Sequence, residues 1–199
     1  MLRETITTER LVLTPLTVAD ADEMVSVLAD AELYEFIGGE APTLAELRAR
    51  YERQSAGGPG AGSSSEEWHN WIVRRAEDRA AVGTVQATVV DAGRAADVAW
   101  VVGAPFQGRG YAVEAAAGMV AWLRERGVAE LRAHVHPEHA ASARVAERVG
   151  LVATGELDDE GEQVWRREFA GPVVAGGGHG PGAAGAVAVG AAERTEADR

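Results

Sequence analysis

Apolar and polar residues recur along this chain with two different periods, which predict strands and helices in turn. Short alternating or apolar runs bounded by turn residues predict strands over residues 11–16, 71–74, 82–90, 97–102, 131–136, 152–156 and 164–169. Apolar residues spaced three or four apart predict helices over residues 17–30, 42–54, 112–126 and 138–149. This order favours one α/β fold, in which a mixed central sheet of about seven strands is flanked by about four helices.

Several of these elements carry local end signals. Thr17 caps the first helix, and Asp20 stands three residues on as its partner. Gly127 follows helix 112–126 and supplies the left-handed residue that commonly ends a helix. The polar turn at residues 158–161 joins the last two strands into a hairpin.

Composition divides the chain into a domain and a tail. The folded domain is predicted to span residues 1–170. Residues 171–199 are rich in Gly and Ala, have no apolar period and predict a disordered tail. Within the domain, the Gly and Ser of residues 55–65 predict a flexible loop.

Charge and cysteine content exclude several classes of protein. The 199 residues carry a formal net charge of −12 and no cysteine. An acidic surface repels nucleic acid, and no apolar run is long enough to cross a membrane or to act as a leader. The absence of thiols excludes disulfides and fits a reducing compartment. We therefore expect a cytoplasmic protein without a nucleic-acid or membrane partner. Its acidity suits cationic acceptors. The sequence leaves open whether the protein forms a homodimer.

The segment 105–116 predicts an anion site. A strand leads into a turn that contains Gly108 and Gly110, and a helix leaves it. The free N–H groups and the positive dipole end of such a helix attract phosphate, and glycine lets the backbone approach a ligand closely. A Walker loop is excluded because no Gly-Lys-Ser/Thr run exists, and Val113 stands where a Rossmann fingerprint needs its third glycine.

The same turn carries the pattern Gln-x-x-Gly-x-Ala at Gln107, Gly110 and Ala112. This resembles the pyrophosphate signature of the GCN5-related N-acetyltransferases (GNAT superfamily). Residues 9–16 and 136–151 resemble the opening and the second helix motif of the branch that acetylates the N-termini of ribosomal proteins. Two positions depart from that branch: His139 stands where Asn is usual, and Leu151 stands where Phe is usual.

The resemblance implies the GNAT fold, acetyl-CoA as co-substrate, no metal, and an amine-bearing small molecule or a peptide N-terminus as acceptor. The implied pyrophosphate contacts are Gln107, Gly108, Arg109, Gly110, Tyr111, Ala112 and Val113. It also implies that one strand splays from the next and exposes backbone N–H groups near Val101, Val102 and Gly103. An acceptor pocket is implied near Tyr34, Glu35 and Phe36. A small-amine or antibiotic acetyltransferase and a non-catalytic acyl-CoA-binding module remain alternatives.

Two residues are candidates for proton transfer. Asp97 begins the strand before the cofactor turn, where related sequences often carry Glu, and is the candidate base; a plain turn aspartate, with water as base, is the alternative. Ser142 matches the Ser of the branch's Asn-x-x-Ser and is the candidate acid for the leaving thiolate. A serine bonded to its own helix is the alternative for Ser142. Ala146 stands where many acetyltransferases use Tyr, so no second acid is apparent.

Histidine and tryptophan residues have competing interpretations. His139 either replaces the cofactor contact of the usual Asn or merely begins its helix. His134 and His136 share one strand face, but the sequence shows no third ligand, so a metal site is not expected. Trp68, Trp71, Trp100 and Trp122 are expected to be core or edge residues.

Overall fold

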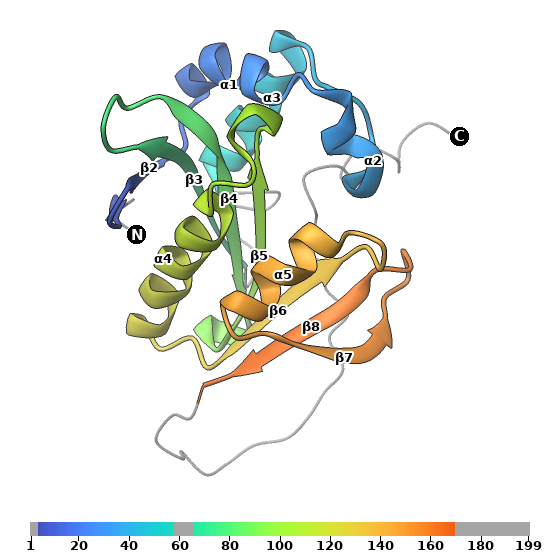
Figure 1. Ribbon diagram of the computed structural model, residues 1–199. Coiled ribbons are helices and arrows are strands. Elements are labelled where there is room, and N and C mark those ends of the chain that lie inside the picture. The colour runs from blue at the N-terminus through green and yellow to red at the C-terminus, as the bar shows by residue number, and fades with distance from the viewer. Residues whose placement is uncertain (1–3, 58–65, 170–199) are drawn as a thin grey trace, which may run out of the picture.

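The computed structural model describes residues 4–57 and 66–169. Within these ranges it contains one eight-stranded sheet and five α-helices (Figure 1). The strands are β1 (Ile6–Thr7), β2 (Leu11–Pro15), β3 (Glu67–Arg75), β4 (Ala81–Val90), β5 (Ala95–Val102), β6 (Glu130–Val135), β7 (Val152–Leu157) and β8 (Gln163–Glu168). The helices are α1 (Ala21–Val27), α2 (Tyr34–Ile37), α3 (Leu44–Ala56), α4 (Tyr111–Glu125) and α5 (Ala140–Arg148). The predicted tail and most of the predicted loop 55–65 lie outside the described residues.

The strands follow the order β1-β2-β3-β4-β5-β6-β8-β7. All neighbours are antiparallel except β5 and β6, which run parallel. Helix α4 makes the crossover that a parallel pair requires. The α/β sheet predicted from the sequence is therefore confirmed, with β1 added at one edge.

Two apolar clusters pack against opposite faces of the sheet. The larger cluster joins α4 and α5 to strands on both sides of the crossover, and Met119, Leu123 and Leu131 are fully buried in it. The smaller cluster joins α1 and α3 to β3 and β4. Figure 1 shows α4 and α5 together on one side of the sheet and α1 and α3 at its upper end. This layering leaves the carboxyl end of β5 between the two groups of helices.

Most predicted ends agree with the structure within a few residues. The segment 17–30 differs, because it divides into a 3₁₀ turn, Val18–Asp20, and the short helix α1. The Thr17 backbone N–H and hydroxyl both donate to Asp20 Oδ2 at 2.7 Å, as the capping pattern predicts. Gly127 has φ +88°, which ends the helical run after α4.

No helix in the described part of the chain combines the length and apolar character needed to cross a bilayer.

Candidate active site

Strands β5 and β6 separate towards their carboxyl ends. Their pairing is confined to residues 95–97 opposite residues 130–132. Beyond this point β5 continues beside β4, while β6 continues beside β8. The splay implied by the resemblance is present, and the β6-facing edge of residues 98–102 has no strand partner among the described residues.

Backbone groups on β5 alternate between the two edges. The Gly103 N–H donates to Val82 O at 2.9 Å, so Gly103 faces β4. Antiparallel pairing gives Val101 the same direction and turns Val102 and Trp100 towards the splay. Gln107 Nε2 reaches Val102 O from that side, at 3.1 Å. The expectation that Val101, Val102 and Gly103 all offer backbone N–H groups is therefore corrected. The backbone groups of Trp100 and Val102 face the splay, whereas those of Val101 and Gly103 face β4.

The turn before α4 is shaped by two left-handed glycines. Gly108 has φ +73° and Gly110 has φ +79°, a region in which other residues are strained. Gly110 is the N-cap of α4 and accepts the first helical hydrogen bond, from Glu114 N at 3.1 Å. A helix leaves its first N–H groups without intrahelical partners, and Ala112 and Val113 in this turn line the cavity described below. Backbone and dipole together favour an anion here.

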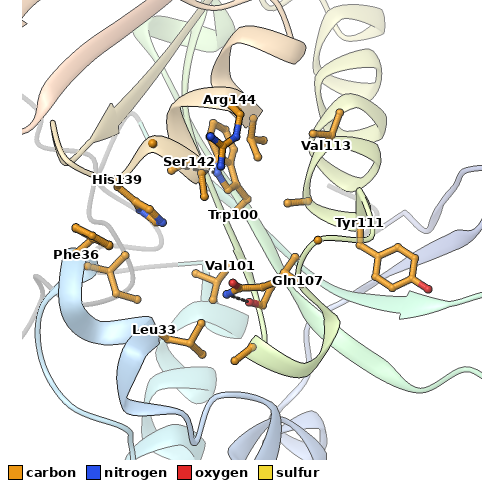
Figure 2. Close-up of a pocket in the computed structure, with 18 of the residues that line it drawn as sticks. Leu33, Phe36, Trp100, Val101, Gln107, Tyr111, Val113, His139, Ser142 and Arg144 are labelled. Atoms are coloured by element: carbon orange, nitrogen blue, oxygen red, sulfur yellow. Dashed lines mark hydrogen bonds between the residues drawn. The ribbon is translucent and has the colours of Figure 1, made fainter.

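Two of the predicted cofactor contacts direct their side chains elsewhere. The Arg109 side chain is exposed, and its Nη2 donates to Pro105 O at 3.4 Å. The Tyr111 ring points away from the cavity (Figure 2) and lies 5.2 Å from the Arg10 guanidinium carbon. Within residues 107–113, the groups that face the cavity are therefore mainly backbone.

A charged cluster ties the glycine turn before α4 to residues 8–10. Glu114 Oε1 accepts hydrogen bonds at 2.7 Å from the Thr8 hydroxyl and the Arg10 N–H, and Oε2 accepts one from Arg10 Nε. Arg10 Nη1 donates in turn to Arg109 O at 3.1 Å. Burial by itself would raise the pKa of Glu114, but the hydrogen bonds from Thr8 and Arg10 outweigh it and lower the pKa. This cluster leaves no local signal in the sequence, because its members lie about a hundred residues apart.

One cavity of about 810 Å³ joins these features. The α4 turn, the carboxyl end of β5, the start of α5 and the segment around α2 form its walls (Figure 2). Its lining includes Glu35, Phe36, Trp100, Val102, Gly108, Val113, His139 and Ser142. A volume of this size is typical of a small-molecule site.

Ser142 is fixed at the cavity by a tryptophan. Trp100 Nε1 donates to Ser142 Oγ at 3.1 Å, and no bond from Ser142 to its own helix is present among the described residues. The hydroxyl proton of Ser142 is therefore available to another acceptor. Trp100 was expected to be a core or edge residue; the structure shows that it lines the cavity and orients Ser142.

His139 enters the cavity from the start of α5. Its ring stacks on Phe36 of α2, with centroids 4.6 Å apart and planes 14° apart. The ring makes no hydrogen bond within residues 4–57 and 66–169, and Figure 2 shows it directed into the cavity. Burial lowers the pKa of His139, His136 lowers it further, and Glu35 opposes the shift.

Asp97 does not lie with Ser142. It is 4% exposed, it does not line the cavity, and its Oδ1 is 3.0 Å from Arg132 Nε. Side chains alternate along a strand, so Asp97 and Trp100 point to opposite faces of β5, and Trp100 is the one that reaches Ser142. Burial raises the pKa of Asp97, while Arg132 and His134 oppose the shift. The structure therefore places the candidate base in a buried ion pair, away from the candidate acid.

Of the three residues expected at the acceptor pocket, two line the cavity and one is buried in the interior. Glu35 and Phe36 line the cavity. Tyr34 does not, because its ring is buried and its hydroxyl donates to Leu28 O at 2.9 Å. Neighbouring residues on the short helix α2 necessarily face different sides.

A separate set of metal-ligand types lies on β6 and the last hairpin. Ligand atoms of His134, Asp158 and Glu162 lie within 4.8 Å of one another, although the sequence indicated no third ligand for His134. His134 Nδ1 is 2.6 Å from Asp158 Oδ2, which is the geometry of an ion pair. Burial would raise the pKa of Asp158, but backbone hydrogen bonds and His134 lower it. The ion pair between His134 and Asp158 accounts for their contact without a metal ion.

Solved structures with this fold include several acetyltransferases. A candidate ribosomal-protein-serine acetyltransferase from Vibrio cholerae is 17% identical, with a TM-score of 0.70, over 85% of this chain and all of that one. The microcin C7 self-immunity acetyltransferase MccE, solved with acetyl-CoA and AMP, is 12% identical, with a TM-score of 0.68, over 81% and 94%. The aminoglycoside acetyltransferase AAC(6')-Ib, solved with coenzyme A, is 17% identical, with a TM-score of 0.65, over 79% and 94%. At these identities the likeness shows the fold alone.

Comparison by sequence is more decisive. No curated protein matches the chain significantly. The family model described as an acetyltransferase (GNAT) domain matches residues 10–152, which is more than half of the chain. That match contains the splayed strands, the glycine turn and the start of α5. The chain therefore belongs to the GNAT acetyltransferase family.

Proposed function

We propose that this protein transfers an acetyl group from acetyl-CoA to a primary amine, with a protein N-terminal α-amine as the first candidate acceptor. One observation carries the proposal. A single cavity joins the N-terminus of α4, the open edge of β5 and a serine hydroxyl held by Trp100. These are the parts that acyl transfer from a thioester needs: an anion site, a donor for the carbonyl oxygen and an acid for the thiolate.

The residues present fit acetyl-CoA as a substrate. The free N–H groups of the first α4 turn suit its pyrophosphate, and the bare backbone at Gly108 leaves room for it. At the splay, the Val102 N–H faces away from β4 and can donate to the thioester carbonyl oxygen. Ser142 supplies a proton to the departing sulfur, because Trp100 occupies one of its lone pairs and leaves its O–H free.

The acceptor side of the cavity favours a cation. Glu32 and Glu35 line it near α2, and carboxylates attract an ammonium group. The family resemblance of residues 9–16 and 136–151 supports a protein N-terminus. A small amine is the second candidate, because the aminoglycoside and microcin acetyltransferases share this fold.

A panel of acceptors tests the proposal. Coenzyme A release would be followed with acetyl-CoA and, in turn, peptides with free N-termini, matched N-acetylated peptides, polyamines and aminoglycosides. Release that needs a free amine supports transfer, and the preferred group of acceptors separates the two candidates. Tight binding of acetyl-CoA with no amine-dependent release from any acceptor would instead identify a non-catalytic acyl-CoA-binding module.

A further inference from the structure

Among the four histidines of the described residues, His139 differs because its ring nitrogens meet no protein partner there. His134 is held by Asp158, and His136 Nδ1 accepts a hydrogen bond from Glu138 N at 3.2 Å. His69 stacks on Trp71, meets Trp122 edge-on, has Glu67 Oε2 3.6 Å from its Nε2, and is not part of the cavity lining. Of these four, only His139 lines the cavity.

The position of this ring is fixed by packing. Phe36 from α2 lies parallel to it at 4.6 Å, so the ring plane is set while its edge stays open to the cavity. Ser142 stands three residues later, in the first turn of α5, and both side chains line the same cavity. The imidazole and the hydroxyl therefore border the same space, from the acceptor side and from the thioester side.

We infer that His139 is the general base that accepts a proton from the acceptor ammonium. This inference rests on the proposed function and assigns to His139 a role other than the cofactor contact expected from its sequence position. The transfer of an acetyl group to R–NH₃⁺ gives R–NH–acetyl and CoA–SH, so the nitrogen must lose two protons. One proton passes to His139 and then to water, and the freed nitrogen pair forms the C–N bond. As the C–S bond breaks, the sulfur takes the hydroxyl proton of Ser142, and the second proton leaves the nitrogen for the Ser142 oxygen, which restores the hydroxyl.

The charged neighbours of the ring support this assignment. Glu35 on α2 and His136 before α5 act on the charge of His139, and the other charged side chains that line the cavity are Glu32, Glu138, Arg144 and Arg148. Burial and His136 lower the pKa of His139 below its usual 6.5, so the ring is neutral and able to accept a proton at pH 7. A neutral imidazole is in general a stronger base than a carboxylate. Asp97, the base expected from the sequence, faces the other side of β5.

The test compares the pH profiles of the wild type and His139→Asn, a change to the amide that is usual in this family branch. The acceptor is alaninamide, a simple primary α-amine with a pKa of about 8. If His139 is the base, wild-type kcat/KM stays level from pH 8 down to about 6.5 and falls only below the pKa of His139. The variant depends on free amine in solution, so its deficit is about 100-fold at pH 7 and shrinks about ten-fold by pH 8. His134→Asn is the matched control, because His134 is held by Asp158 and is not part of the cavity lining; it keeps its kcat/KM at pH 8.

Binding measurements separate the other roles of His139. Calorimetry should show acetyl-CoA affinity within about two-fold of wild type in His139→Asn. A variant that binds acetyl-CoA at least ten-fold more weakly, with kcat and pH profile retained, would mean that the ring contacts the co-substrate only and would overturn the inference. In the wild type, the NMR titration of the His139 ring proton should move to lower pH when alaninamide binds, because an ammonium beside the ring opposes its charge. An unmoved titration at saturating alaninamide would also overturn it, even if the variant failed to fold.

A different result would overturn the proposed function itself. A wild-type protein without amine-dependent release of coenzyme A would overturn both ideas. A wild type that turns over, with a His139→Asn profile of the same shape and height, would overturn the base assignment alone.

Discussion

At the scale of single residues, the site depends on a few side chains whose partners come from other elements. Ser142 receives a hydrogen bond from Trp100 of β5, and His139 is stacked against Phe36 of α2. Neither side chain is held by its own helix. Their orientation is therefore set before a ligand arrives, which is the condition for effective proton transfer.

Ser142→Ala should lower kcat by about 10²-fold, the low end of general-acid contributions, because a thiolate is a good leaving group. The affinity for acetyl-CoA should change little, since the lost group acts mainly on the departing sulfur. Single-turnover kinetics and calorimetry measure the two quantities. Ser26→Ala is the matched control, because the Ser26 hydroxyl only bonds Glu23 O of its own helix, at 2.8 Å. An unchanged kcat in Ser142→Ala, with chemistry rate-limiting, would leave Ser142 a structural role only.

At the scale of elements, the decisive feature is the entry into α4. Two glycines with positive φ bring the chain from the end of β5 into the helix, and they leave the first N–H groups facing the cavity. A Cβ added at Gly108 would meet nothing within 4 Å, so a side chain there projects into open space next to the anion site. The element thus provides both the charge and the room that a pyrophosphate needs.

Gly108→Glu should weaken acetyl-CoA binding by at least ten-fold, because it adds a carboxylate beside the expected pyrophosphate. Gly127→Glu is the control: Gly127 also has positive φ and an empty Cβ position, but it follows the far end of α4. Both variants should lose about 1–2 kcal/mol of stability from the left-handed backbone. Equal acetyl-CoA affinities for the two variants in calorimetry would remove the turn from the binding site.

At the scale of the whole molecule, residues 8–10 support the glycine turn that precedes α4. Glu114 accepts hydrogen bonds from Thr8 and Arg10, and Arg10 continues to the carbonyl of Arg109. Glu114 is 16% exposed, so this cluster is only partly screened by water. These hydrogen bonds therefore join the edge of the sheet, the turn and α4 to one another.

Glu114→Gln should destabilise the fold by about 2 kcal/mol at pH 7, because an amide replaces a charged acceptor that faces three donors. The folded-state pKa of Glu114 is lowered, so its contribution is complete above the unfolded pKa of about 4.3 and disappears as pH falls through the folded value. The stability gap between wild type and variant should therefore be constant from pH 8 to 5 and shrink below pH 4. Urea unfolding across this range measures it.

Glu125→Gln provides the comparison on the same helix, because Glu125 is exposed at its last turn. A pH-independent gap for Glu114→Gln, or an equal loss in both variants, would contradict the role assigned to the cluster.

Sequence by itself determined the order of the elements and the glycine turn that precedes α4. Apolar periodicity and capping residues act over a few positions, so the strands, the longer helices and the Gly108–Gly110 turn could be predicted locally. The short elements β1 and α2 could not, because two and four residues carry too little periodic signal. Their conformation depends on neighbours that are distant in the chain.

Tertiary structure alone decided which candidates meet. Side chains alternate along β5, so Asp97 and Trp100 lie on opposite faces of the sheet. Only packing shows which of these faces holds the cavity. The stacking of His139 on Phe36 and the link from Glu114 to Arg10 join segments about a hundred residues apart. Long-range contacts of this kind leave no local pattern, because the energy that forms them comes from burial and hydrogen bonding in the complete fold.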